Sequence, residues 1–265
     1  MVWLSAALAD EDPVVESLTL GGGAASFTRP EYLGSKDDST LAVPAPYIDY
    51  YSRKLELSRE GLLVKLLEHE HLHLRVSGSG TLPGGDTQDG VREGMPELLP
   101  TFGLGPSLDG DFASSEDVQW KLRVPVRGVV ASDLGRFDFI GWETSPNLSV
   151  RRKSTHGALQ LSMAASLGPV FATGKHHRYY YEVKSEFATP TRPAYDVSGG
   201  YSGTRLSLSA GISKGQWFLG IATGYDDLDG ATFDDSPLVQ TGHGLTVGVA
   251  LFYKFWKWER RESDA

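Results

Sequence analysis

The sequence lacks cysteine altogether, and a chain without thiols is compatible with an oxidising compartment. It also has no run approaching the roughly 18 apolar residues of a transmembrane helix, so crossing a membrane would require strands. Positive charge is scarce, because 25 Lys and Arg face 34 Asp and Glu and give a formal charge of −9. That balance argues against nucleic acid as a partner, since nucleic acid favours a basic surface.

Glycine, aromatic residues and a period-two alternation are abundant instead. The chain has 31 Gly, 11 Tyr, 11 Phe and 6 Trp, a mixture common in β proteins with aromatic girdles. In the segment 244–255, Gly248 and Lys254 lie on one face, and the other face carries Leu245, Val247, Val249, Leu251, Tyr253 and Phe255. The same alternation recurs in 120–130, 158–168, 205–212 and 217–225. A helix would scatter these side chains around its axis, so the pattern predicts strands.

These strands predict an all-β protein, a transmembrane antiparallel up-and-down β-barrel. An apolar face opposite small or polar residues suits a wall between lipid and a polar lumen. A soluble, lipocalin-like barrel is the alternative for the fold. The predicted strands are 17–28, 42–52, 54–67, 70–79, 97–112, 117–131, 136–152, 157–171, 200–213, 215–226 and 244–256.

The number of wall strands stays open between ten and twelve. The eleven segments conflict with the even strand number of bacterial single-chain barrels. Ten strands follow if 17–28 is not a full wall strand, and twelve follow if a further strand lies within a long loop. We prefer ten.

Short and long connections alternate along the chain. The joints at 152–156 and 213–215 are tight, whereas 78–96, 172–199 and 226–243 are long and polar. In outer-membrane barrels the turns are periplasmic and the loops extracellular. With the C-terminus in the periplasm, all three long segments lie outside together, which favours one barrel domain over residues 10–265.

The first nine residues resemble the end of a secretory signal peptide. Ala7-Leu-Ala9 is a small-x-small cleavage site, and the acidic run Asp10-Glu-Asp12 follows it. The basic n-region is missing, which an upstream start would explain. We therefore expect export, with residues 1–9 as a residual signal peptide.

Several short motifs, in this order, resemble the MipA/OmpV family of Gram-negative outer-membrane proteins. Leu20-Gly-Gly-Gly23 and the following Arg29–Ser35 segment resemble the family's N-terminal signature, with Pro30, Tyr32, Gly34 and Ser35 at its key positions. The strand 43–50 carries Pro44 and Pro46, and Asp235-Ser236-Pro237 begins an element that precedes the last strand. The element at 180–183 departs from the family pattern, because Glu182 stands where the family has Gly.

Turn chemistry accounts for these motif residues, so we expect structural roles rather than ligand contacts. Gly34 can supply a positive φ, and Pro44 and Pro46 remove ladder donors. Ser236 before Pro237 is driven toward extended geometry and can fix the return into the last strand. Gly248, Leu251, Tyr253 and Phe255 resemble the C-terminal signal for barrel assembly, although the chain continues through Trp256 and Trp258 into a charged tail.

The resemblance implies a non-catalytic scaffold in the outer membrane of a Gram-negative bacterium. The expected partners are outer-membrane lipid, a lytic transglycosylase and a peptidoglycan synthase, without a cofactor. Two alternatives remain, a surface adhesin or receptor acting through the long loops, and a small-solute pore.

Chemical sites are weakly supported by the residue patterns. Along an unbroken strand His69, His71 and His73 would share one face, as a metal site requires, but a turn near 68–70 would separate them. Ser236 with His243 and Ser154 with His156 are candidate hydrolase pairs, yet no Gly-x-Ser-x-Gly elbow supports them. We expect no catalytic residues and no metal.

Several cationic side chains fall on the polar faces of the predicted strands. We expect them in the lumen, balanced by carboxylates from other strands, with Phe218 and Phe252 also filling it. These cations are Lys121, Arg123, Arg127 and Arg205.

Overall fold

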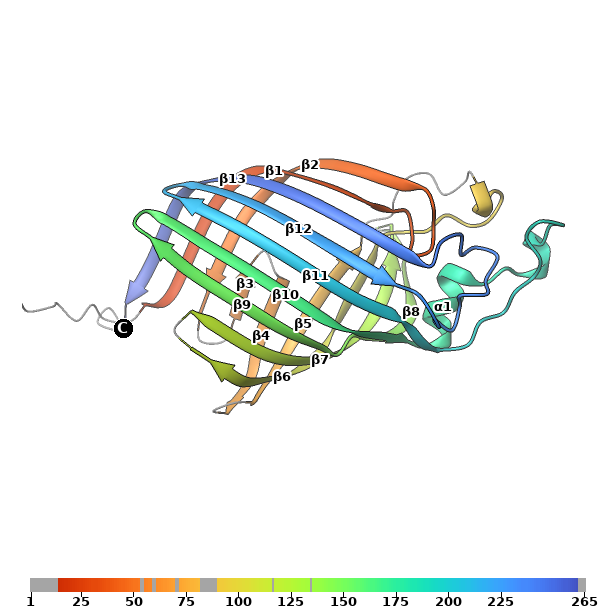
Figure 1. The fold of residues 1–265 in the computed structure, drawn as a ribbon, viewed down its shortest axis with the longest axis horizontal. Coiled ribbons are helices and arrows are strands. Elements are labelled where there is room, and N and C mark those ends of the chain that lie inside the picture. Colours follow the sequence, from red (N-terminus) through yellow and green to blue (C-terminus); the bar gives the residue numbers. More distant parts are fainter. Residues whose placement is uncertain are drawn as a thin grey trace, which may run out of the picture.

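The computed structural model describes residues 14–52, 55–58, 61–69, 72–81, 90–115, 117–133 and 135–261. One antiparallel sheet winds around the molecule in chain order, and the pairing of β13 with β1 closes it (Figure 1). The predicted up-and-down barrel is confirmed. Its strands are β1 (Val14–Pro30), β2 (Asp38–Tyr51), β3 (Leu55–Ser58), β4 (Gly61–His69), β5 (Leu72–Thr81), β6 (Thr101–Ser114), β7 (Val118–Ser132), β8 (Phe137–Thr144), β9 (Asn147–His156), β10 (Leu159–Ala172), β11 (Gly200–Lys214), β12 (Trp217–Asp227) and β13 (His243–Arg261).

The thirteen strands of the described residues occupy twelve positions in the wall. β8 and β9 are separated at Ser145-Pro146 but share one position, because both pair with β7 and with β10. The preference for ten strands is therefore wrong, for two reasons. The segment 17–28 is part of the full wall strand β1, paired with β2 and β13. The extra strand comes from the predicted segment 54–67, which holds β3 and β4 rather than one strand.

β2 has a strand partner along only one of its edges for most of its length. It pairs with β1 from Asp38 to Tyr51, but with β3 only at Tyr50 and Tyr51. Among the described residues no strand pairs with the rest of that edge. Pro44 and Pro46 are two positions apart, so their backbone nitrogens point to the same edge. A strand with an unpaired edge can hold prolines there and keep the ladder to β1 intact.

The outer face of the barrel is apolar, as a lipid-facing wall requires. More large hydrophobic side chains are exposed there than on the surface of a typical soluble monomer. The band between the two ends includes Leu108, Leu122, Val124, Leu148, Leu167, Leu208, Leu219, Ile221, Val247, Val249 and Leu251. Aromatic pairs flank it, Phe112–Trp120 and Trp217–Tyr253 at one end, Phe139–Trp142 and Phe171–Tyr201 at the other. Such girdles mark the two membrane–water interfaces.

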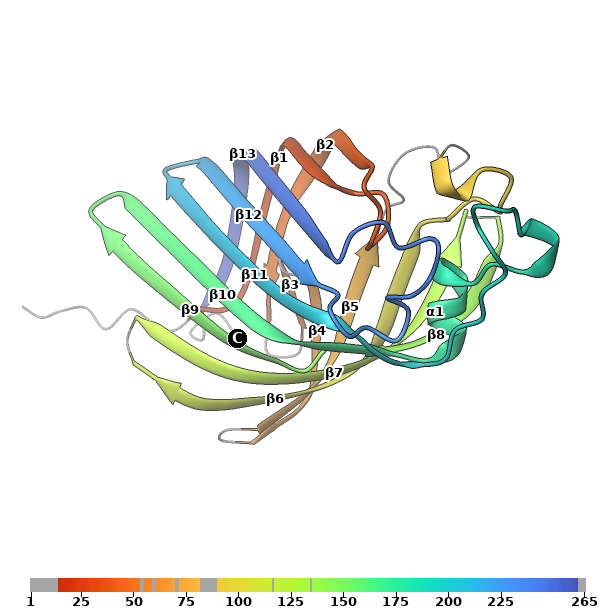
Figure 2. The same cartoon turned by 45° about the vertical axis from the view of Figure 1, so that its right-hand side comes forward.

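The two ends of the barrel differ in their connections. Figure 2 shows the tight β9–β10 and β11–β12 turns at one end, here called the turn end, and the long connections together at the other, the loop end. The predicted grouping of the long segments is thereby confirmed for their described residues. A short helix, α1 (Gly174–Tyr181), and the 3₁₀ turns η1 (Gly90–Arg92) and η2 (Ser185–Phe187) lie at the loop end. The sequence pattern did not predict α1.

Candidate functional site

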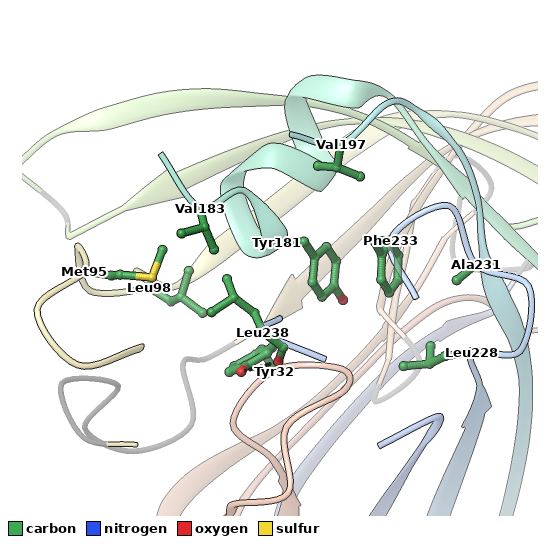
Figure 3. Packing of buried hydrophobic residues seen from close by; sticks show 10 residues of the cluster. All are labelled: Tyr32, Met95, Leu98, Tyr181, Val183, Val197, Leu228, Ala231, Phe233 and Leu238. Carbon is green, nitrogen blue, oxygen red and sulfur yellow. Dashed lines mark hydrogen bonds between the residues drawn. The ribbon is translucent and has the colours of Figure 1, made fainter. Parts of the chain in front are cut away.

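A hydrophobic cluster closes over the loop end of the lumen. It unites side chains from four connections and is here called the cap (Figure 3). The rings of Tyr181 and Phe233 stack in parallel with their centroids 3.7 Å apart, and Phe233 is almost fully buried. The cap consists of Tyr32, Met95, Leu98, Tyr181, Val183, Val197, Leu228, Ala231, Phe233 and Leu238. Burial of so many large side chains makes the loop end a packed structure rather than a set of separate loops.

Two family motifs that are distant in sequence meet inside the cap. The Tyr32 hydroxyl donates to the carbonyl oxygen of Leu238 at 2.7 Å. The carbonyl oxygen of Gly34 accepts the backbone N–H groups of Gln240 at 2.7 Å and Thr241 at 3.1 Å. Gly34 itself has φ +93°, and a Cβ there would lie 3.2 Å from a methyl group of Val239. The Pro30–Ser35 segment and the segment after Pro237 thus hold each other in place.

Ser236 is the polar anchor of the second motif. Its buried hydroxyl donates to the carbonyl oxygen of Tyr181 at 2.8 Å and so ties the motif to α1. Asp235 beside it is exposed, and Pro237 is partly buried. In the first motif, Pro30 ends β1, and the buried Ser35 hydroxyl accepts the backbone N–H of Asp37 at 3.1 Å. These residues make contacts within the protein.

The histidines of α1 line the underside of the cap. His177 is buried between the carbonyl oxygen of Ser198, at 2.8 Å from Nδ1, and the hydroxyl of Ser202, at 2.7 Å from Nε2. Burial, together with the neighbouring charge of His177, lowers the pKa of His176 from 6.5 to about 4. Burial also raises the pKa of Tyr180 to about 12. At neutral pH His176 and Tyr180 are therefore uncharged.

The lumen-facing cations pair with carboxylates of other strands, as the sequence predicts. Arg205 Nε donates to Asp226 Oδ1 at 2.6 Å, and Arg127 Nη1 lies 3.9 Å from Glu143 Oε1. These two pairs line a cavity of about 660 Å³ directly under the cap. Lys121 and Arg123 lie deeper, 3.3 Å from Asp111 and 3.7 Å from Asp109.

An aromatic cluster narrows the lumen nearer the turn end. Tyr47 packs against Phe252 with ring centroids 5.5 Å apart and against Phe218 at 6.3 Å, and all three are buried. Phe218 and Phe252 are buried inside the barrel, on the side that the sequence predicted, and Tyr47 from β2 packs against them. Side chains thus enter the lumen at two levels, the cap and this cluster.

β13 continues past Trp217, the first residue of β12, and forms a two-stranded ribbon with β1. β12 pairs with β13 only as far as Tyr253, whereas β1 continues to Arg261. The register shifts at Phe255, so that Leu20 faces Trp256 and Leu18 faces Trp258. Residues 14–20 and 256–261 are here called the terminal ribbon, which lies at the barrel end opposite α1 (Figure 1). Salt bridges support it between Arg260 and Glu16 at 3.1 Å and between Lys257 and Glu259 at 2.6 Å.

The residues of the C-terminal assembly motif all lie in β13. Leu251, Tyr253 and Phe255 are exposed on the outer face. Gly248 faces inward, where a Cβ would lie 3.5 Å from the Cβ of Phe27. The aromatic residues that follow, Trp256 and Trp258, extend this outer aromatic surface into the terminal ribbon.

The candidate hydrolase pairs differ in geometry. Ser154 Oγ lies 3.1 Å from His156 Nδ1, but Ser154 is only half-buried and His156 is exposed next to the β9–β10 turn. Ser236 instead bonds to Tyr181, while His243 stacks against Tyr225. Neither pair therefore has the buried, oriented arrangement of a nucleophile and its base.

Of the candidate metal run Glu68–His73, Glu70 and His71 lie outside the described residues, and so does the whole segment 1–9. His73 is described, and its Nε2 lies 3.1 Å from Asp111 Oδ2. Within the described part of the chain, no group of three or more His, Asp or Glu side chains is arranged to hold a metal ion. Nor does that part contain a helix long and apolar enough to cross a membrane.

The closed sheet, the apolar outer band and the aromatic girdles define an outer-membrane β-barrel protein. The chain belongs to the MipA family, described as MltA-interacting protein MipA, whose family model matches residues 20–255. No curated protein sequence matches the chain.

Solved structures of similar shape are outer-membrane proteins. The chain is similar to the outer membrane protease OmpT from Escherichia coli, with 10% identity over 91% of this chain and 96% of that one and a TM-score of 0.33. It is also similar to the NanC porin, with 10% identity, coverage of 90% and 100%, and a TM-score of 0.37. For OprD from Pseudomonas aeruginosa the identity is 8%, both coverages are 96%, and the TM-score is 0.30. Likenesses at these scores carry no information on function.

Proposed function

We propose that this protein is a non-catalytic scaffold for peptidoglycan synthesis and remodelling in the outer membrane of a Gram-negative bacterium. The observation that carries the proposal is membership of a family described as MltA-interacting protein. The proposed partners are a lytic transglycosylase and a peptidoglycan synthase. Fold alone assigns no such role, so the proposal rests on the family and on the surfaces that the barrel offers.

The side chains inside the barrel favour a scaffold over an open pore. The cap covers the loop end, and Tyr47, Phe218 and Phe252 pack together nearer the turn end. Ion pairs of Arg127 and Arg205 occupy the wall between these levels.

The surface proposed for partner contact is the turn end with the terminal ribbon. In outer-membrane barrels short turns face the periplasm, where peptidoglycan enzymes act. The ribbon there exposes Trp256 at 46% and Trp258 at 40% of their surface. The backbone N–H of Lys254 still donates to the carbonyl oxygen of Gln216 at 2.7 Å, and no described strand pairs with that side of β13 at Trp256 or Trp258. Exposed tryptophans on such a strand are suited to protein recognition.

Affinity capture from solubilised outer membranes tests this role. Trp258→Ala removes an exposed indole from the terminal ribbon, and Trp142→Ala removes one from the outer face near the loop end, where Trp142 is 49% exposed. We expect the wild-type protein and the Trp142 variant to recover a lytic transglycosylase and a peptidoglycan synthase, and the Trp258 variant to recover much less of both. Failure of the wild-type protein to recover either enzyme would remove the scaffold role. It would leave the adhesin or receptor alternative, which acts through the loop end.

A further inference from the structure

The cavity under the cap has the size and the lining of a small-molecule binding site. Its volume of about 660 Å³ falls within the usual range for ligand pockets, about 300–1,000 Å³. Aromatic side chains from β1, the cap and α1 form much of its wall. They are Phe27, Tyr32, Tyr180, Tyr181 and Phe233. Aromatic walls with a few polar groups among them are typical of pockets that take organic ligands.

Arg29 brings an unused hydrogen-bond donor to this cavity. It is the last residue but one of β1, its side chain lines the cavity, and its Cζ lies 5.9 Å from the centre of the Phe27 ring. Its Nη2 atom is shielded from solvent and has no hydrogen-bond partner. Glu31 also lines the cavity, but it takes part in an interaction of its own. A shielded donor without a partner is unusual in a folded protein and calls for an acceptor.

The two other arginines of the cavity differ from Arg29, because each already has a carboxylate. Arg127 Nη1 lies 3.9 Å from Glu143 Oε1, and Arg205 Nε donates to Asp226 Oδ1 at 2.6 Å. No ion pair joins Arg29 to a carboxylate of the described residues. Arginine keeps its positive charge in proteins, so a negatively charged acceptor suits this guanidinium best.

His176 of α1 supplies a second unused polar atom. Its side chain lines the same cavity, and its Nδ1 atom is shielded from solvent without a hydrogen-bond partner. Because burial lowers its pKa to about 4, the imidazole is neutral at neutral pH. A neutral imidazole can carry its proton on Nδ1 and donate it to an acceptor in the cavity.

Tyr180 lies close to both of these groups. Its ring centroid is 5.3 Å from that of His176. Burial raises the pKa of the Tyr180 hydroxyl to about 12, and the nearby charge of Arg29 opposes this rise. The hydroxyl itself hydrogen-bonds to the side chain of Thr101. The unused atoms of Arg29 and His176 therefore lie on either side of an aromatic ring whose own hydroxyl is satisfied.

We propose that the cavity under the cap binds a small aromatic carboxylate. The carboxylate accepts hydrogen bonds from Arg29 and His176, and a bond from a guanidinium to a carboxylate is charge-assisted. The ring of the ligand packs against the aromatic side chains of the wall. This site lies inside the loop end, whereas the proposed scaffold contacts lie on the terminal ribbon, so either property can hold without the other.

Calorimetric titration of the purified full-length barrel in neutral detergent with sodium benzoate tests the site. Benzyl alcohol and acetate are the matched probes, because the first has the ring without the charge and the second has the charge without the ring. We expect benzoate to bind at least about tenfold more tightly than either, because only benzoate uses both kinds of contact.

Substitution of Arg29 tests the position of the carboxylate. Arg29→Gln removes the charged donor, so it should weaken benzoate binding by about tenfold and change the affinity for benzyl alcohol by less than about twofold. The matched control is Arg136→Gln in the β7–β8 connection at the loop end, where the side chain is 68% exposed and outside the cavity. It should leave both affinities within about twofold of the wild type.

Heat-modifiable migration in gel electrophoresis shows whether each variant is a folded barrel. If Arg29→Gln fails to fold, Arg29→Lys carries the comparison, because it keeps the charge but loses the planar fork and should still weaken benzoate binding severalfold. Absence of benzoate binding to the wild-type barrel would overturn the proposal. So would equal affinities of the Arg29 and Arg136 variants for benzoate, or benzyl alcohol binding as tightly as benzoate.

Discussion

Aromatic residues are buried at one end of this barrel and exposed at the other. At the loop end, Tyr181 and Phe233 stack inside the cap, shielded from solvent. At the turn end, Trp256 and Trp258 stay exposed on a two-stranded ribbon that β12 does not reach. Buried rings contribute mainly to stability, whereas exposed rings at the edge of a structure are free to contact a partner. The comparison shows a packed loop end and an exposed turn end, where we propose that partners bind.

The family motifs follow the same division. The Tyr32 hydroxyl, the Gly34 carbonyl and the Ser236 hydroxyl all form hydrogen bonds within the cap, so each of these groups already has a partner in the folded chain. The assembly motif and the tryptophans after it lie on the outer face of β13. A motif can therefore characterise the family through packing alone, without marking the surface that binds a partner.

The largest effect is expected for truncation of the cap's central ring. Phe233→Ala leaves a cavity against Tyr181 and should destabilise the cap by about 3–5 kcal/mol. Hydrogen exchange of the α1 amides measures this loss directly. The control is Phe255→Ala at the turn end, where the side chain is 60% exposed. Similar rates of α1 amide exchange in the two variants would contradict the distinction between a packed and an exposed end.

A smaller loss of stability is expected when alanine replaces either of two glycines with positive φ, one at each end of the barrel. Gly34→Ala places a Cβ in a left-handed residue and 3.2 Å from Val239, and should cost the cap about 1–3 kcal/mol. Gly215→Ala, in the β11–β12 turn with φ +57°, meets nothing within 4 Å and bears the backbone strain alone. Urea titration followed by limited proteolysis compares the two. A Gly215 variant that is the less stable of the pair would contradict the packing assigned to the cap.

Acidification should loosen the loop end before the turn end. Because burial lowers the pKa of His176 to about 4, the folded cap resists protonation while the unfolded chain takes up a proton near pH 6.5. The stability due to this group is therefore complete above about pH 6.5 and is lost as the pH falls toward 4. Hydrogen exchange of α1 across this range measures the loss. His176→Gln should make the exchange less dependent on pH, and an unchanged dependence would exclude His176 as its source.

The smallest change in stability is expected for the exposed tryptophans. Trp258→Ala and Trp142→Ala should each change the free energy of unfolding by no more than about 0.5 kcal/mol, because neither side chain belongs to a buried cluster of the described residues. Urea unfolding in detergent provides the comparison. A markedly destabilised Trp258 variant would indicate that the terminal ribbon serves packing rather than recognition.

The wall of the barrel was largely predictable from the sequence, because period-two alternation reports directly on which side chains face lipid. Most of the predicted segments agree with the strands to within a few residues, and lumen cations such as Arg205 were identified by their polar face. The prediction at 136–156 was wrong, because 136–152 spans the break between β8 and β9, and 152–156 belongs to β9 rather than to a tight joint. The division of 54–67 into β3 and β4 was missed, because a short hairpin keeps the alternation of the strands around it.

The cap could not be predicted in the same way. Its packing depends on contacts between distant residues, such as Tyr32 and Leu238, which are 206 positions apart. Local patterns carry no information about such pairs. α1 was missed because it is only eight residues long and rich in tyrosine, a residue that also favours strands. The run Tyr179–Tyr181 was the available signal, since three adjacent aromatics in a polar connection require burial.

Photo-crosslinking in living cells tests the assignment of recognition to the turn end most directly. A photoreactive amino acid placed at position 258 on the terminal ribbon, and separately at position 142 near the loop end, captures whatever protein lies against each site. We expect covalent adducts with a lytic transglycosylase or a peptidoglycan synthase from position 258, and none with either enzyme from position 142. Adducts with these enzymes from position 142 alone, or from neither position, would contradict the account.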